Sequence, residues 1–196
     1  MRVITAPEEY KKRENDIIVF LAGGITNCRD WQNIVIEKLK TMCKYFNDDA
    51  DDLVVMNPRR ENFQIDDPKA AYEQIYWEYN RLNDADIFSM YFCSGDSDQP
   101  ICMYELGRNV YRLQMYDDYD DRIIIMVERG YKREQDVRIQ VGLAACDNDL
   151  VMVEEPEDAP TIHAHNIYNS YRKIKERKDS YRRIKERKKR MDIFDD

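Results

Sequence analysis

The chain has 196 residues, of which 43% are hydrophobic and 36% are charged, and its formal net charge is -8. This length fits one domain with an appended segment, and the composition supports a buried core beneath a strongly charged surface. No run approaches the ~20 apolar residues of a membrane span, and the N-terminus lacks the apolar stretch of a signal peptide. The five cysteines form no C-x-x-C pair, so we expect reduced thiols and a cytoplasmic protein.

The charge is distributed very unevenly along the chain. Between Arg172 and Arg190 there are twelve Lys and Arg residues against three acids, a net charge of +9, which leaves -17 for the remainder. The chain therefore combines an acidic body with a basic C-terminal segment.

The first half of the chain predicts two strands and two helices. Residues 1–15 are polar, and we expect an irregular lead-in there. The apolar run 17–22 predicts a buried strand that ends at Gly23 and Gly24, where a tight turn lets a ligand approach the backbone. Asp30 suits the N-cap of a helix over 31–46. A second strand over 53–56 and a second helix over 68–82 follow.

The second half continues the alternation of strands and helices. Strands are predicted over 87–93, 122–127 and 149–153, and helices over 100–116, 131–145 and 164–191. Strands that alternate with helices are typical of an α/β fold with a parallel sheet covered on both faces. We therefore predict a doubly wound, flavodoxin-like sheet of five strands in the order 2-1-3-4-5, within a domain over residues 1–160. Residues 161–196 are predicted to form a separate charged helical tail.

The stretch from Asp86 to Gly107 holds the strongest candidate for a functional residue. An apolar strand is followed by a polar turn and by Pro100, which suits the first position of a helix. Glu105 lies within the first two turns of that helix, where we expect the helix dipole to favour its ionised form. It also follows the carboxyl end of a central strand, where open α/β sheets bind their ligands.

Other candidate residues each have an alternative structural interpretation. Glu78 could be catalytic or could lie on a solvated helix face, and Trp31 could stack on a base or pack in the core. Arg59 and Arg60 could bind a phosphate or pair with surface acids. The two histidines show no metal-ligand pattern, and no G-x-G-x-x-G or Walker loop is present, so we expect no metal and no cofactor.

An ordered set of short motifs adds a family resemblance over residues 16 to 145. The motifs are Phe20-Leu-Ala-Gly-Gly-Ile25, Asp30-Trp-Gln32, Asn57-Pro-Arg-Arg60, Gln74-Ile-Tyr-Trp-Glu78, Ala85-Asp86 and Tyr104-Glu-Leu-Gly107. Together they resemble the nucleoside 2-deoxyribosyltransferase-like family. The resemblance implies a flavodoxin-like fold and cleavage of an N-glycosidic bond. It also implies that Glu105 is the nucleophile and that Glu78, eight residues before Asp86, protonates the leaving base.

Two positions depart from the pattern that this resemblance implies. Gln99 occupies the position where the transferases usually carry an aspartate for the sugar hydroxyls, and Asp98 could replace it only if the loop shifts by one residue. Phe20 occupies the position of a tyrosine that contacts the nucleophile in many of these enzymes. The alternative function is therefore a nucleotide-binding or assembly module that kept the fold and lost turnover.

The basic segment contains a tandem repeat, Ser-Tyr-Arg-Lys-Ile-Lys-Glu-Arg-Lys over 170–178 and Ser-Tyr-Arg-Arg-Ile-Lys-Glu-Arg-Lys over 180–188. Its thin apolar stripe is typical of an amphipathic helix. The acidic body would repel nucleic acid. We therefore expect the tail to dock on the acidic protein surface of a neighbouring subunit in a homo-oligomer, with docking on its own domain as the alternative.

Overall fold

A computed structural model describes residues 1–61, 63–64, 66–95, 97–116, 118–145 and 150–192, with the side chains of 119 and 188–192 left aside. Its centre is a parallel sheet with the strand order β1-β3-β2-β4-β5-β6. The strands are β1 Arg2–Thr5, β2 Ile17–Gly23, β3 Leu53–Asn57, β4 Ile87–Phe92, β5 Ile123–Glu128 and β6 Val151–Glu154. The helices are α1 Trp31–Tyr45, α2 Pro68–Asp84, α3 Pro100–Leu113, α4 Glu134–Ala145 and α5 Ala159–Asp192, with a short 3₁₀ turn over Tyr119–Asp121.

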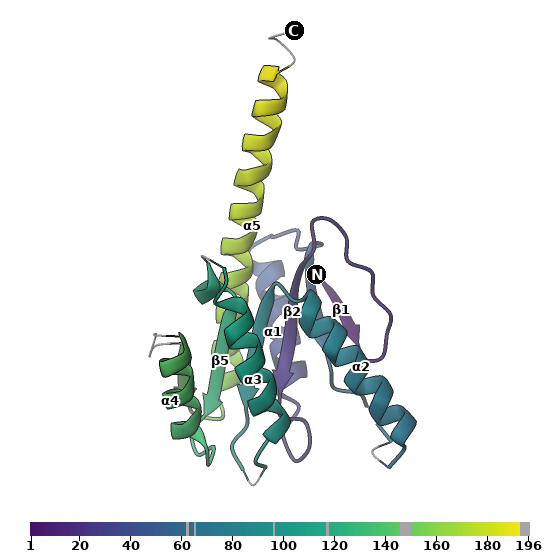
Figure 1. Ribbon diagram of the computed structural model, residues 1–196, viewed down its shortest axis with the longest axis vertical. Helices are drawn as coiled ribbons and strands as arrows, with labels where there is room; N and C mark the ends of the chain where they lie inside the picture. The colour runs from purple at the N-terminus through teal and green to yellow at the C-terminus, as the bar shows by residue number, and fades with distance from the viewer. Residues whose placement is uncertain (62, 65, 96, 117, 146–149, 193–196) are drawn as a thin grey trace.

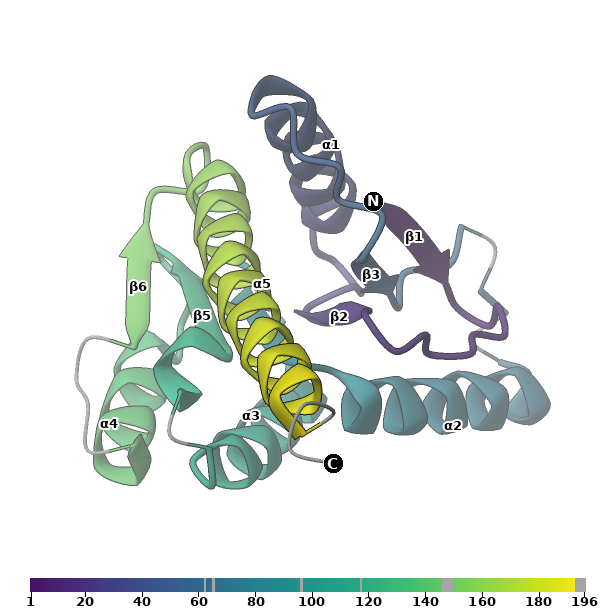
Figure 2. The same cartoon turned by 90° about the horizontal axis from the view of Figure 1, so that it is seen from above.

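Helices cover both faces of the sheet (Figures 1 and 2). One core cluster joins the sheet to α2, α3 and α4, and the other joins it to α1 and α5. The central strands β2, β4 and β5 are buried almost throughout, which is why they read as continuous apolar runs rather than alternating ones. No helix in the part of the chain that the structure describes is long and apolar enough to cross a membrane.

The predicted count of five strands is wrong, because the lead-in contributes a sixth. Strand β1 lies at the edge of the sheet, where it pairs only with β3, for example Val3 with Val55. It contains only two strongly apolar residues, Val3 and Ile4, so its sequence gives little strand signal. The five expected strands do follow one another in the relative order 2-1-3-4-5, but the complete sheet has six strands and a different edge.

Aspartates cap the starts of two helices, of which only Asp30 was predicted from the sequence. The side chain of Asp30 accepts a hydrogen bond from the backbone N–H of Asn33, so its predicted role as N-cap of α1 is confirmed. At the start of α2, Asp67 accepts from the backbone N–H of Lys69, and Pro68 occupies the first helical position. Both caps satisfy N–H groups that a helix end leaves without partners.

Helix α5 begins five residues before the predicted start at 164, and its first half belongs to the core. Ile167, Tyr171 and Ile174 are at most 1% exposed and pack against the sheet and α1. The basic side chains next to them bind aspartates that precede β3 and β5. Lys175 pairs with Asp48 and Asp52 at 3.0 and 3.3 Å, and Lys173 and Arg177 each pair with Asp121 at 2.7 Å. The first half of the basic segment therefore docks on acidic surface of its own chain, which was the alternative to docking on a neighbouring subunit.

The tandem repeat supplies a matched pair of variants that tests this packing. We expect Ile174→Ala to lower the free energy of unfolding by about 2–5 kcal/mol, because it removes a buried side chain and leaves a cavity. Ile184 occupies the same place in the second repeat and is 54% exposed, so Ile184→Ala should change the stability of the single chain, unfolded at high salt and low protein concentration, by less than ~0.5 kcal/mol. Urea unfolding of both variants measures the difference, and equal effects would contradict the assignment of α5 to the core.

Candidate active site

The candidate site lies where the carboxyl ends of β2, β3 and β4 meet. The segments that follow these strands, around Gly24, Pro58 and Ser97, close a cavity of about 240 Å³ together with the start of α3. At ~30 Å³ per water this is the space of about eight waters. This edge of a parallel sheet is the usual ligand site of open α/β folds, so the sequence-based location agrees with the cavity.

A second, larger cavity of about 580 Å³ adjoins the first between α2 and α3. Its wall is more apolar and aromatic, and it includes Phe63, Ile75, Tyr79 and Tyr104. Six residues line both cavities: Ile25, Thr26, Pro58, Glu78, Ile101 and Glu105. The two candidate catalytic carboxyl groups therefore lie on the boundary between a small chamber and a large apolar one.

The electrostatics of Glu105 differ from the sequence-based expectation. Burial raises the pKa of Glu105 to about 8, with a further increase from the charge of Glu78 and a smaller opposing effect of Arg108. Glu105 is the sixth residue of α3, and the helix dipole acts mainly within the first turn. Burial and a second carboxylate therefore outweigh the dipole, and the expectation of a dipole-stabilised carboxylate is wrong.

The two carboxyl groups share one site, and both titrate above their ordinary range. Burial also raises the pKa of Glu78, opposed by its hydrogen bond from Gln74. Among the described residues, no group donates a hydrogen bond to the Glu105 carboxylate, whereas Glu78 accepts one. Because burial and the charge of Glu78 raise the pKa of Glu105 to about 8, the pair holds its proton on Glu105 near neutral pH.

Gln74 fixes the orientation of Glu78. Its side-chain N–H₂ group donates to Oε1 of Glu78 and to the backbone oxygen of Pro58, both at 2.8 Å. Both partners are acceptors, so the amide cannot turn over without losing them. The other oxygen, Oε2, accepts no hydrogen bond from any residue that the structure describes.

Gly23 and Gly24 line the smaller cavity, and close packing around them leaves no room for a side chain. Gly23 has φ of +150°, and a Cβ there would collide with the carbonyl oxygen of Tyr91. A Cβ on Gly24 would collide with the Gln99 amide and the Cys28 sulfur. Trp31 is fully buried, stacks on Tyr91 and donates from Nε1 to the Gly24 oxygen at 3.0 Å. It supports the glycine turn from behind, so its prediction as a substrate contact is corrected.

The two arginines after β3 have different positions. Arg59 points into the β2–α1 connection, where its guanidinium donates to Gln32 at 2.9 Å and to the backbone oxygen of Arg29 at 2.9 Å. Its Nε and Nη2 donors are engaged with the protein, so the prediction that it binds phosphate is corrected to a loop-holding role. Arg60 lines the larger cavity, where it pairs with Glu73 at 3.1 Å and lies over the ring of Phe63.

The loop after β4 leaves Asp98 outside the cavities. Asp98 is exposed and its carboxylate pairs with Lys132 at 2.8 Å, so the alternative of a shifted substrate-binding role is corrected. Gln99 does line the smaller cavity, but its amide donates to the backbone oxygen of Cys93 at 2.9 Å and accepts from the Cys93 N–H. Phe20 lines the same cavity and brings no donor toward Glu105.

Several cavity residues were not assigned from the sequence. Gln74 could have been predicted most easily, because it precedes Glu78 by four residues and therefore lies on the same face of α2. Arg108 follows Glu105 by three residues, so it lies on the same face of α3, and it lines the larger cavity. Thr26, Ser97 and Phe63 lie on loops, where no periodicity indicates the direction of a side chain. No group of three or more His, Cys, Asp or Glu residues in the described ranges is arranged to hold a metal ion.

Comparison with known proteins identifies the family of the chain. The sequence profile of the nucleoside 2-deoxyribosyltransferase-like family matches residues 16–115, which contain β2 to α3 and both carboxyl residues. The chain belongs to this family. No protein of curated function matches the chain. The family match covers the smaller cavity and both glutamates, and it ends before β5, α4 and α5.

The raised pKa of Glu105 predicts a pH-dependent stability. The folded protein retains a proton that the unfolded chain releases near pH 4.5, so this contribution is full below that pH and is lost as pH rises through about 8. Glu105→Gln stays neutral and should gain stability relative to the native protein between pH 5 and pH 9. One pKa unit corresponds to about 1.4 kcal/mol, so the gain should reach a few kcal/mol.

Urea unfolding across this pH range measures the effect. Glu73→Gln is the matched control, because Glu73 lies on α2 outside the two cavities and pairs with Arg60 near the surface. If the stability of Glu105→Gln and of the native protein changed in parallel with pH, the raised pKa would be contradicted.

Proposed function

We propose that this chain breaks the N-glycosidic bond of a nucleoside, 2'-deoxynucleoside or nucleoside 5'-monophosphate. The sugar is then transferred to another base or to water. The observation that carries the proposal is the pair Glu105 and Glu78 on the shared wall of the two cavities, both with raised pKa values. The smaller cavity fits a pentose, and the larger apolar cavity fits a base. The four described cysteines are free, which supports a cytoplasmic location.

Glu105 has the position of the nucleophile in this reaction. Its ionised carboxylate attacks C1' and forms a C1'–O bond while the C1'–N bond breaks through an oxocarbenium-like transition state. The absence of a hydrogen bond to this carboxylate among the described residues keeps its oxygens available. The proton that Glu105 holds in the resting site passes to Glu78 before the attack. The positive charge that develops at C1' then favours ionised Glu105, against the effect of burial on its pKa.

Glu78 has the position of the general acid. Its hydrogen bond from Gln74 fixes one oxygen, and the other delivers a proton to the departing base. A second base or a water then attacks C1', gives its proton to the Glu78 carboxylate and releases Glu105. Atoms and charge are then restored, and Glu78 is again protonated.

The role of Glu105 is tested with an isosteric variant. Glu105→Gln should fold and should lower base release from a panel of nucleosides and their monophosphates by roughly 10³-fold or more, because an amide is a poor nucleophile. Chromatography of the free base measures the rate. In the native protein, acid-quenched samples should contain a pentosyl group on the peptide that includes Glu105. Native rates in Glu105→Gln would refute the assignment of the nucleophile.

The role of Glu78 is tested by changing the leaving group. Glu78→Gln should slow release of an ordinary purine by about 10²–10⁴-fold. A 7-methylguanine nucleoside carries a positive charge on its base and leaves without protonation, so its release should be much less affected. Gln74→Leu should show the same selectivity in weaker form, because it removes the bond that orients Glu78. Equal losses with both substrates would indicate a structural role, and Glu73→Gln is again the control.

A second candidate is a nucleotide-binding or assembly module without turnover. Gln99 and Phe20 favour it, since the Gln99 amide is committed to Cys93 and Phe20 cannot donate a hydrogen bond to Glu105. This function predicts that nucleosides or nucleotides raise the melting temperature while no free base is formed. Release of base that depends on Glu105 excludes it.

A further inference from the structure

The tandem repeat presents one set of side chains twice, once docked and once exposed. Residues 170–178, the docked repeat, and 180–188, the outer repeat, differ only at Lys173 and Arg183. Ile174 is 1% exposed in the docked repeat, whereas its counterpart Ile184 is 54% exposed. Tyr181 is 77% exposed, although its counterpart Tyr171 is fully buried. The outer repeat therefore carries a recognition surface that its own domain does not cover.

Helix geometry explains why the outer repeat cannot use the same site. Ten residues of α-helix advance by about 15 Å and rotate by about 2.8 turns, so the two repeats point about 80° apart. Figure 1 shows the C-terminal half of α5 rising beyond the amino ends of the strands. Among the described side chains 181–187, the one hydrogen bond to a residue outside α5 is donated by Arg182 to the side-chain oxygen of Asn15 at 2.7 Å.

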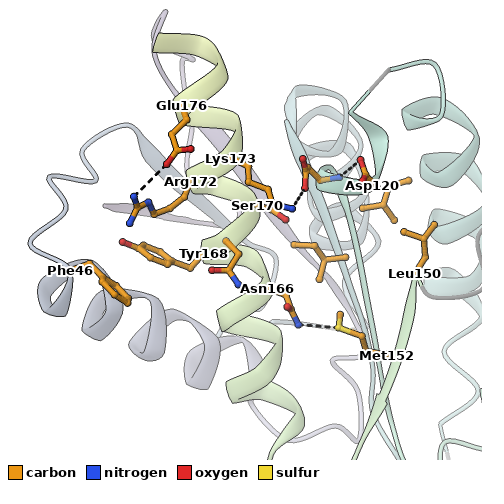
Figure 3. A pocket seen from close by; sticks show the side chains of 14 residues that line it. Phe46, Asp120, Leu150, Met152, Asn166, Tyr168, Ser170, Arg172, Lys173 and Glu176 are labelled. Carbon is orange, nitrogen blue, oxygen red and sulfur yellow. Dashed lines mark hydrogen bonds and ion pairs between the residues drawn. The ribbon is translucent and has the colours of Figure 1, made fainter. Parts of the chain in front are cut away.

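The docked repeat shows which surface these side chains bind. The Tyr171 hydroxyl donates to Asp52 at 2.6 Å, and Lys175 pairs with Asp48 and Asp52. On the other side of the helix, Lys173 extends toward the 118–121 loop and pairs with Asp121 at 2.7 Å (Figure 3). The docked repeat thus packs its apolar side chains against the core and pairs its basic side chains with aspartates on both sides of the helix.

The rim formed by the loops 47–52 and 118–121 retains unneutralised acids after this docking. Asp49 and Asp120 are exposed, one in each loop, and neither forms an ion pair with any residue that the structure describes. They flank the site where α5 leaves the body. A second copy of the chain therefore offers an acidic surface that matches the basic outer repeat.

We propose that two copies of this chain pair through their α5 helices about a two-fold axis. The outer repeat of each copy lies against the rim of the other. The pairing covers Tyr181 and Ile184 and brings Arg183 and Arg187 to Asp49 and Asp120 of the other copy. One patch serves both copies, as a two-fold interface requires. Nucleic acid fits less well, because the remainder of the chain carries a charge of -17 and repels a polyanion.

Charge reversal on the two sides of this interface tests the pairing. One variant carries Arg183→Glu and Arg187→Glu, and the other carries Asp49→Lys and Asp120→Lys. Light scattering at low ionic strength should give a dimer for the native chain and a monomer for each variant alone, with dimerisation weakened at least ~10-fold. An equimolar mixture should recover the dimer, because each altered helix then meets an oppositely altered rim. High salt should dissociate both dimers.

A variant with Lys69→Glu and Arg138→Glu changes the charge by the same amount as the altered helix, on α2 and α4, and should remain dimeric. A monomeric native chain, a mixture that stays monomeric, or dimers that persist in each variant alone would each overturn the proposal. If the native chain were monomeric and bound random-sequence duplex DNA with a salt dependence that Arg183→Glu with Arg187→Glu abolished, the outer repeat would be a nucleic-acid arm. These measurements do not depend on Glu105 or on turnover.

Discussion

The need to bury both faces of a parallel sheet determines most of this structure. Strands β2, β4 and β5 carry apolar side chains on both faces, so helices must cover the sheet on both sides. Helices α2, α3 and α4 cover one face, but α1 alone covers only part of the other. The first half of α5 completes this face, which is why a segment with a basic composition contributes Ile167, Tyr171 and Ile174 to the core. Its lysines and arginines then meet the aspartates at the amino ends of the strands.

The sequence was sufficient for elements that are long and apolar. Runs such as 17–22 and 87–93 exceed what a loop tolerates, and the alternation with helices leaves few topologies. It was insufficient for β1, whose two apolar residues gain stability only from pairing with β3. It also assigned α5 to a separate tail on the basis of the charges over 172–190, although Ile167, Tyr171 and Ile174 follow one another at the four- and three-residue spacing of a buried helix face. The lesson is that periodicity carries more information about burial than net charge does.

For the site, the sequence located the edge of the sheet but not the partners of individual side chains. The glycine pair after β2 and the helix after β4 had to lie together, because parallel strands end at the same edge. The partners of Arg59 and Asp98, in contrast, come from segments about 30 residues away. Arg59 binds carbonyl oxygens of the β2–α1 connection, and Asp98 binds Lys132. No local pattern encodes such contacts, so a charged residue beside a predicted site can be a structural anchor as easily as a ligand.

The same distinction applies to the charge of the two glutamates. Position on a helix suggested an ionised Glu105, yet burial and the neighbouring Glu78 dominate its pKa. A resting site that holds a proton costs less free energy than two buried carboxylates would. In the proposed reaction the cation that forms at C1' supplies the missing counter-charge at the moment when Glu105 must be ionised. The protein then needs no permanent positive partner for Glu105. This agrees with the small effect of Arg108, which lowers the pKa of Glu105 only slightly. A strong permanent partner would instead hold the carboxylate in an ion pair and reduce its nucleophilicity, so the weakly compensated pair suits a nucleophile better than a salt bridge would.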